Sequence, residues 1–213
     1  MSLISSRIIN IFKSRNVVLE QLQTRGYDIS SYENTSMTEI DAMLTNSQLD
    51  MLVTHKDTGV KMYIKYYFTL KQTSRQIKKE ALDDIIDDLY HIEDVLTKKD
   101  TLMVIIDDEP NDTIITRLKY LYDHDGIFVV LHNIHRLQFN ILNHTLVPKM
   151  WILGESEKTD FMQNYKIRNL TQLPQISRFD PQALVLGIRP NDICQINRDS
   201  VTAMTTDYFR VCV

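Results

Sequence analysis

The sequence predicts two regions, a layered α/β region over residues 1–140 and a small α+β region over residues 141–213. In the first region, helical periodicities alternate with short apolar runs that are typical of buried strands. In the second region the apolar runs are short, and four of the five prolines of the chain lie there. A chain of 213 residues that is 43% hydrophobic can bury one large core or two small ones.

The first region begins with two predicted helices. Apolar residues recur at helical spacing at Ile4, Ile8, Ile11, Phe12, Val18, Leu19 and Leu22. Gly26 follows at the position where a left-handed residue ends a helix. The segment Ser36-Met37-Thr38-Glu39 has the form of a capping box, so a short second helix is expected to begin there.

A sheet is predicted after these helices. Residues 51–55 and 60–68 are rich in β-branched and aromatic side chains and flank a Lys56-Asp57-Thr58-Gly59 turn, which indicates a hairpin. An apolar stripe predicts a long helix over residues 74–97 that covers the sheet. The apolar runs 102–106 and 127–131, separated by a helical pattern, indicate a strand–helix–strand unit with buried strands.

The second region predicts short strands at 150–153, 193–197 and 208–213, and a helix at 156–165. Asp180 is expected to cap a helix that starts at Pro181 and ends at Gly187. Leu173-Pro174 favours extended backbone. Arg198 and Arg210 lie on apolar strands, where their guanidinium groups can bind carboxylates or backbone carbonyls. These features are typical of a docking surface and not of a reaction centre.

Charge and composition argue against a DNA-binding, membrane-spanning or metal-binding protein. The net charge is −4, and residues 141–213 carry 8 of the 24 Lys+Arg and 7 of the 28 Asp+Glu, so residues 1–140 are acidic by five. We therefore expect poor binding of duplex DNA by the chain alone. No stretch approaches the roughly 20 apolar residues of a membrane span. Cys194 and Cys212 are expected to be reduced and buried, and we expect no metal and no cofactor.

Several polar clusters could carry chemistry, but a structural role is favoured for each. Asp83, Asp84, Asp87 and Asp88 are expected to form a solvated helix face rather than a metal site. Asp107-Asp108-Glu109-Pro110 ends a buried strand, where α/β proteins place ligands, yet it also fits a turn and cap. His132 and His135 are too few for a metal site. The sequence has no glycine-rich phosphate loop and no nucleophile elbow.

A series of short motifs fills the chain from His144 to its last residue. In order they are His144-Thr145-Leu146-Val147-Pro148-Lys149, Tyr165, Gln172-Leu173-Pro174-Gln175-Ile176, Asp180-Pro181, Ala183, Leu186-Gly187, Arg198-Asp199-Ser200-Val201-Thr202 and Tyr208-Phe209-Arg210-Val211-Cys212-Val213. This series resembles the assembly domain of the fifth-largest subunit shared by eukaryotic nuclear RNA polymerases and of the archaeal counterpart of that subunit. The chain departs from the family pattern at Met150, Asn191, Val201 and Met204, the second and last of which replace glycines.

The resemblance implies a non-catalytic subunit of a multisubunit DNA-dependent RNA polymerase, present at one copy per enzyme. The C-terminal domain would dock on the largest subunit, and other polymerase subunits are further partners. The partner-binding residues that it implies are His144, Pro148, Leu173, Pro174, Asp180, Pro181, Gly187, Arg198, Ser200, Thr202, Tyr208 and Arg210. The implied location is the nucleus in a cell, or the host cytoplasm and virion if the source is a large DNA virus.

The first region resembles the jaw domain of the eukaryotic subunits through Arg25-Gly26-Tyr27 and Gly126-Ile127-Phe128-Val129. In the family, a proline-bearing loop after the last jaw strand reaches toward downstream DNA. Residues 131–136 contain no proline, so any DNA contact is expected to be weak or indirect.

Two alternatives remain open at this point. The jaw domain resembles a nuclease fold, but Tyr63-Ile64-Lys65 has tyrosine where a metal-binding carboxylate would be expected. A free-standing transcription adaptor is the other alternative.

Overall fold

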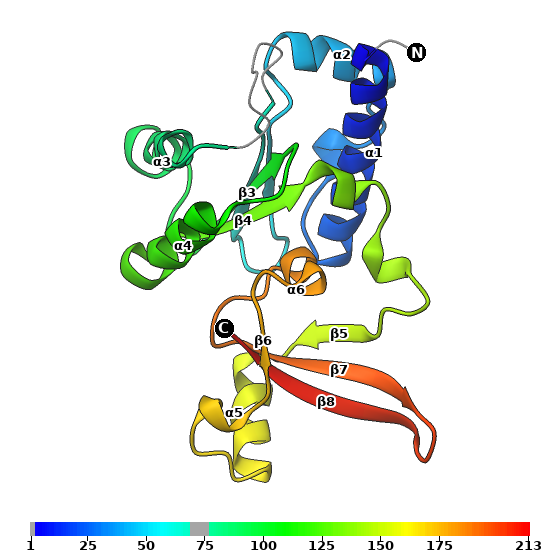
Figure 1. Cartoon of the computed structure of the whole chain (residues 1–213), viewed down its shortest axis with the longest axis vertical. Coiled ribbons are helices and arrows are strands. Elements are labelled where there is room, and N and C mark those ends of the chain that lie inside the picture. The colour runs from blue at the N-terminus through cyan, green and yellow to red at the C-terminus, as the bar shows by residue number, and fades with distance from the viewer. Residues whose placement is uncertain (1–2, 69–76) are drawn as a thin grey trace. The chain divides into compact units, whose positions relative to one another are not determined.

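The computed structural model describes residues 3–68 and 77–213, and it divides the chain into two compact units, Met1–Phe139 and Asn140–Val213. Each unit contains a four-stranded sheet, in the orders β1-β2-β3-β4 and β5-β7-β8-β6. The protein is therefore a mixed α/β chain with two separate sheets (Figure 1).

The N-terminal unit follows the predicted order of elements. Its helices and strands are α1 (Leu3–Thr24), α2 (Met37–Thr45), β1 (Met51–Thr54), β2 (Lys61–Tyr66), α3 (Lys79–Asp87), β3 (Thr101–Ile106), α4 (Asp112–Tyr120) and β4 (Phe128–Asn133). Strands β1 and β2 form the predicted antiparallel hairpin. The predicted strand–helix–strand unit is confirmed, because β3 and β4 pair in parallel around α4.

The sheet of this unit lies between two helical layers. Figure 1 shows α1 on one face and α3 with α4 on the other. On the α1 side, apolar residues of α1 and α2 pack against Met51, Met62, Ile64 and Met103 in one buried cluster. Every residue of β3 and β4 is buried, which explains why the central runs 102–106 and 128–131 are continuously apolar in the sequence. The strand ends Thr101, His132 and Asn133 are buried polar residues.

Helix α2 begins and helix α1 ends next to the predicted capping residues. The Ser36 side chain accepts a hydrogen bond from the Glu39 amide, and the Glu39 carboxylate accepts one from the Ser36 amide. Gly26, just after α1, has φ +86°, the left-handed conformation expected of a residue that ends a helix. An added Cβ there would lie 3.1 Å from Nε2 of His55, so both the backbone and the available space favour glycine.

The prediction of one long helix over residues 74–97 is wrong in length. Helix α3 starts at Lys79 and continues as a π-helical turn only to Ile92, while Ser74 lies outside the described residues. Asp94 has φ +50°, which a helix cannot accommodate, and the amide of Leu96 donates to the carbonyl of Leu89. Leu96 is thus buried by a chain reversal and not by a further helical turn.

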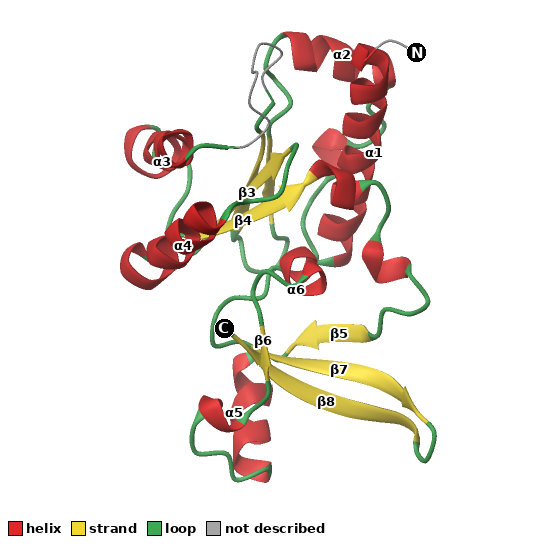
Figure 2. Cartoon of the chain, in the orientation of Figure 1, coloured by secondary structure: helices red, strands yellow, loops and turns green. Residues whose placement is uncertain are grey.

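The C-terminal unit contains β5 (Lys149–Ile152), α5 (Glu155–Asn164), β6 (Gln175–Ile176), α6 (Pro181–Leu186), β7 (Ile193–Ser200) and β8 (Met204–Cys212). Its core is small and consists of Met150, Ala183, Ile188, Cys194, Ile196 and Cys212. Strands β7 and β8 are longer than the predicted strands 193–197 and 208–213, and they pair as a hairpin, in which the polar segment around Thr205 and Asp207 pairs although it has no apolar pattern. Figure 2 shows this two-stranded ribbon extending beyond the other strands of the sheet.

Candidate functional site

Helix α6 organises the centre of the C-terminal unit. The Asp180 carboxylate accepts hydrogen bonds from the amides of Gln182 (2.9 Å) and Ala183 (3.4 Å), and Pro181 occupies the first helical turn. Gly187 ends the helix with φ +67°. The predicted cap is confirmed. The Gln182 side chain then donates to the carbonyl of Pro148 at 2.7 Å, which fixes the segment that leads into β5.

The structure brings Pro148 and Arg198 together. Both line a surface depression of about 680 Å³ in the C-terminal unit, between the segment that enters β5 and the β7–β8 hairpin. The Arg198 guanidinium lies 5.2 Å from the centre of the Tyr208 ring on the neighbouring strand. This is a cation–π distance, and the tyrosine stays half-exposed.

Other residues of the predicted set shape the backbone of the unit. Nδ1 of His144 accepts from the amide of Leu146 at 3.2 Å, and Oγ of Ser200 accepts from the amide of Thr202 at 3.4 Å. Arg210 donates from Nη1 to the carbonyl of Gln175 at 3.0 Å, which links β8 to β6. The guanidinium of Arg210 is therefore used at least partly inside the unit.

Exposed apolar side chains gather on this unit beyond the predicted set. Leu146 and Met204 are 85% and 86% exposed, and Trp151 and Tyr165 are also exposed. The strand alternation of Met150 (buried) and Trp151 (exposed) is a signal that could have identified Trp151 from the sequence. Of the thirteen exposed large apolar side chains among the described residues, eight lie on this unit, and contiguous apolar surface is typical of protein-binding sites.

Two departures from the family pattern have a backbone explanation. Asn191 and Met204, which replace glycines, have φ +73° and +58°. Asparagine tolerates this left-handed conformation, whereas methionine is strained in it. The left-handed backbone at Met204 therefore has an energetic cost.

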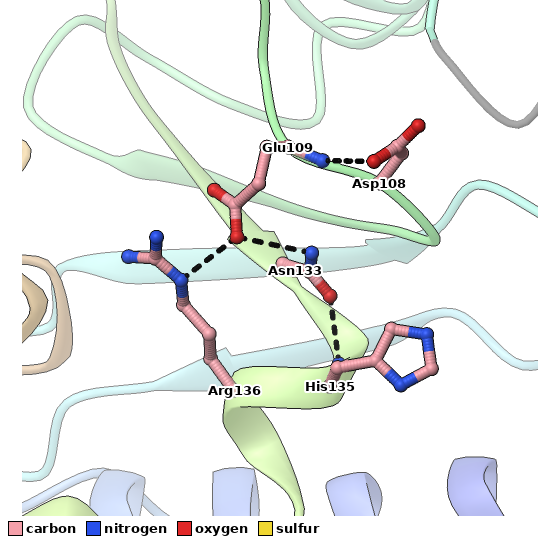
Figure 3. A network of polar contacts seen from close by, with 5 residues as sticks. All are labelled: Asp108, Glu109, Asn133, His135 and Arg136. Atoms are coloured by element: carbon pink, nitrogen blue, oxygen red, sulfur yellow. Dashed lines mark hydrogen bonds and ion pairs between the residues drawn. The ribbon is translucent and has the colours of Figure 1, made fainter.

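In the N-terminal unit, the loop after β3 binds the segment after β4 (Figure 3). Oε1 of Glu109 accepts from Nδ2 of Asn133 (3.1 Å) and from Nε of Arg136 (2.9 Å). The Asn133 side chain in turn accepts from the amide of His135 at 2.8 Å. Nearby, Asp107 forms an ion pair with Arg7 of α1 at 3.0 Å. These carboxylates at the ends of the parallel strands are engaged by cations of the chain itself.

The position that would matter for nuclease chemistry is occupied by a hydrogen-bonded phenol. Oη of Tyr63 donates to Asp50 at 3.1 Å, and Nζ of Lys65 lies 3.3 Å from the same carboxylate oxygen. Burial, together with the charge of Asp50, raises the pKa of Tyr63, so the phenol stays protonated at neutral pH. Within residues 3–68 and 77–213, no group of three or more His, Cys, Asp or Glu could hold a metal ion.

The remaining candidate residues, the aspartates of α3 and the two cysteines, are in ion pairs, exposed to solvent or buried as free thiols. Asp83 on α3 forms an ion pair with Arg117 of α4 at 2.8 Å, while Asp84, Asp87 and Asp88 are exposed. Cys194 and Cys212 are buried free thiols, and burial raises the pKa of Cys212 to about 12. Among the described helices none is long and apolar enough to span a membrane.

Together these features define the class of protein. The chain is a two-unit α/β protein in which Asp107 and Glu109, at the end of β3, form ion pairs within the chain. Most of the exposed large apolar side chains of the described residues lie on the C-terminal unit, as in a subunit that binds other proteins. Residues 139–212 match the family model described as RNA polymerase Rpb5, C-terminal domain.

The relatives agree with this match. The DNA-directed RNA polymerase subunit Rpo5 of Thermococcus kodakarensis is 45% identical over 76 residues, which cover 36% of this chain and 92% of the relative. The subunit rpabc1 of DNA-directed RNA polymerases I, II and III of Dictyostelium discoideum is 28% identical over 97% of this chain and 98% of its own length. The DNA-directed RNA polymerase subunit 5-like protein 1 of Arabidopsis thaliana is 26% identical over 98% of this chain and 97% of its own. The chain belongs to the Rpb5/Rpo5 family of RNA polymerase subunits.

Proposed function

We propose that the chain is a non-catalytic structural subunit of a DNA-directed RNA polymerase, present at one copy per enzyme. The observation that supports this most strongly is the match of the C-terminal unit to nearly the whole of the archaeal subunits, together with full-length similarity to eukaryotic ones. The family membership does not favour the alternatives of an endonuclease or a free-standing adaptor.

The C-terminal unit is the part that we assign to assembly, with the largest polymerase subunit as its partner. Its own core is small, and exposed Trp151, Leu146 and Tyr208 leave apolar surface that a partner would cover. The docking residues that we propose are the family motif residues that are accessible on this unit, Pro148, Arg198 and Tyr208 among them.

The N-terminal unit is proposed to act as a jaw beside downstream DNA, with weak or indirect contact. The segment after β4 is held by Glu109, which neutralises Arg136 by an ion pair at 2.9 Å. Because that cation is paired and the region is acidic overall, few counterions would be released on duplex binding.

The location follows from the relatives. The eukaryotic relatives support a nuclear location if the chain comes from a cell. If it comes from a large DNA virus, the host cytoplasm and the virion are the proposed places.

The assembly role can be tested with the tagged full-length chain. Native mass spectrometry of the purified enzyme is expected to give one copy per largest subunit, whereas an adaptor would vary in amount with salt. In a pull-down, residues 141–213 are expected to retain the largest subunit and residues 1–140 are not, with circular dichroism as the folding control. Retention by the N-terminal half alone would reverse the assignment.

The nuclease alternative has its own test. The pure chain is expected not to nick supercoiled DNA with Mg²⁺ or Mn²⁺. Metal-dependent nicking that disappears in Lys65→Ala would contradict the non-catalytic assignment.

A further inference from the structure

The outer edge of β8 is open over half of the strand. Strand β8 pairs with β7 from Met204 to Val211, but β6 pairs with it only at Val211 and Cys212. Among the described residues, no strand pairs with the outer edge of β8 between Thr205 and Phe209. This segment forms the part of the ribbon that extends beyond β6 in Figure 2.

The direction of the free backbone groups follows from the pairing at the end of the strand. The amide of Val211 donates to the carbonyl of Pro174 in β6's lead-in segment, so it points away from β7. Backbone groups alternate in direction along a strand, so those of Asp207 and Phe209 point outward as well. The parallel ladder cannot continue toward Phe209 through Pro174, because proline has no amide hydrogen.

At another sheet edge, that of β1, side-chain and backbone groups of the chain bind the free backbone groups of the strand. At the edge strand β1, Oη of Tyr32 accepts from the amide of Leu52 (3.0 Å) and donates to its carbonyl (3.2 Å). The amide of Asp28 donates to the carbonyl of Thr54 at 2.9 Å. Free edges are normally protected in this way, or by lysine, proline or a bulge. The segment Thr206-Asp207-Tyr208-Phe209 has no lysine and no proline, the carboxylate of Asp207, its one charged group, accepts from Asn197 of β7, and the pairing with β7 is regular.

We propose that the outer edge of β8, from Thr206 to Phe209, receives an extended segment of another polymerase subunit by strand addition. The proposal rests on the assembly role assigned above and specifies how the C-terminal unit binds. Strand addition forms main-chain hydrogen bonds, and alternate side chains provide specificity.

The side chains of β8 define the chemistry of the added segment. Asp207 is exposed on one face, where Nδ2 of Asn197 holds its carboxylate at 2.7 Å. Tyr208 is exposed on the opposite face, beside Arg198. The added strand should therefore place a lysine or arginine next to Asp207 and an apolar side chain next to Tyr208.

Asp207→Pro tests this geometry, with Asp207→Ala as the matched control. Both variants lose the carboxylate and its bond to Asn197, but only the proline removes the outward amide hydrogen. No bond to β7 is lost, because that amide points away from β7. We expect Asp207→Pro to bind polymerase that lacks this subunit at least about tenfold more weakly than Asp207→Ala does. Equal binding of the two variants would overturn strand addition, while failure of the wild-type chain to bind would overturn the assembly role itself.

Amide exchange of the wild-type chain gives a second measurement that does not depend on a variant folding. The amides of Asp207 and Phe209 are expected to exchange at least tenfold more slowly in the polymerase than in the free chain. Unchanged exchange would refute the proposal. Light scattering of the free chain tests whether the edge of β8 binds a second copy of the chain instead. If the wild-type chain is a dimer and Asp207→Pro is a monomer, the edge binds a second copy and the proposal is wrong.

Discussion

Replacing Arg210 by alanine separates a role inside the C-terminal unit from a role across an interface. Nη1 of Arg210, on β8, donates to the carbonyl of Gln175, on β6, at 3.0 Å, so this side chain links the two strands. Strand β6 has only two residues, and its other links to this part of the chain include the amides of Val211 and Val213, which donate to Pro174 and Ile176. Loss of Arg210 should therefore loosen β6 locally.

The size of the effect follows from the type of bond. A hydrogen bond from a charged donor contributes about 1.5 to 3 kcal/mol, and the lower end applies here because the Arg210 side chain is in contact with water. A loss of about 1.4 kcal/mol corresponds to a tenfold change in the opening equilibrium. We expect the amides of Val211 and Val213 to exchange about tenfold faster in Arg210→Ala.

Native-state hydrogen exchange of the full-length chain measures this directly. Arg210→Lys keeps the charge but not the forked donor, so an intermediate rate is expected. The argument is refuted if exchange in Arg210→Ala stays within about twofold of the wild type while binding to the polymerase falls. That result would show that the guanidinium pairs with a partner subunit.

Three further predictions concern stability and DNA. Asp100→Asn should lower the free energy of unfolding at pH 7 by about 1.5 to 3 kcal/mol, because the buried carboxylate accepts from the amides of Lys61 (2.6 Å) and Thr97 (2.7 Å). Burial by itself would raise the pKa of Asp100, but these hydrogen bonds lower it below its usual value. The contribution is thus present above about pH 4 and is lost as the pH falls through the folded-state pKa, so urea midpoints of the two proteins should converge at acid pH. Met204→Gly should stabilise the β7–β8 hairpin by about 0.5 to 1 kcal/mol by relieving the left-handed strain, seen as slower amide exchange in the hairpin; faster exchange would contradict it. Fluorescence anisotropy should detect no tight complex of the free chain with duplex DNA at physiological salt, and a tight complex would reveal a basic patch that the net charge conceals.

Signals that act over three or four residues could be predicted from the sequence. The Ser36–Glu39 capping box and the Asp180–Pro181–Gly187 helix form as predicted, because each depends on side chains next to the backbone groups that they satisfy. The apolar runs 102–106 and 127–131 also indicated the buried strands, which the structure places at Thr101–Ile106 and Phe128–Asn133, since strands covered on both faces are mostly apolar.

Contacts between distant segments were not predictable in the same way. Glu109 and Arg136 are 27 residues apart, and Asp50 meets Lys65 only because β1 and β2 pair in one register. The end of α3 was missed because its apolar stripe continues to Leu96, which is buried by a chain reversal at Asp94.

The sequence by itself determined the family, the order of elements, the helix caps and the apolar frame of both units. The tertiary structure alone decided which charges pair, where Arg210 donates its hydrogen bond and which edge of β8 stays open. The physical reason is that a side chain's identity constrains its own turn of backbone, whereas partners across a sheet depend on strand register and length, which the packing of the whole unit sets.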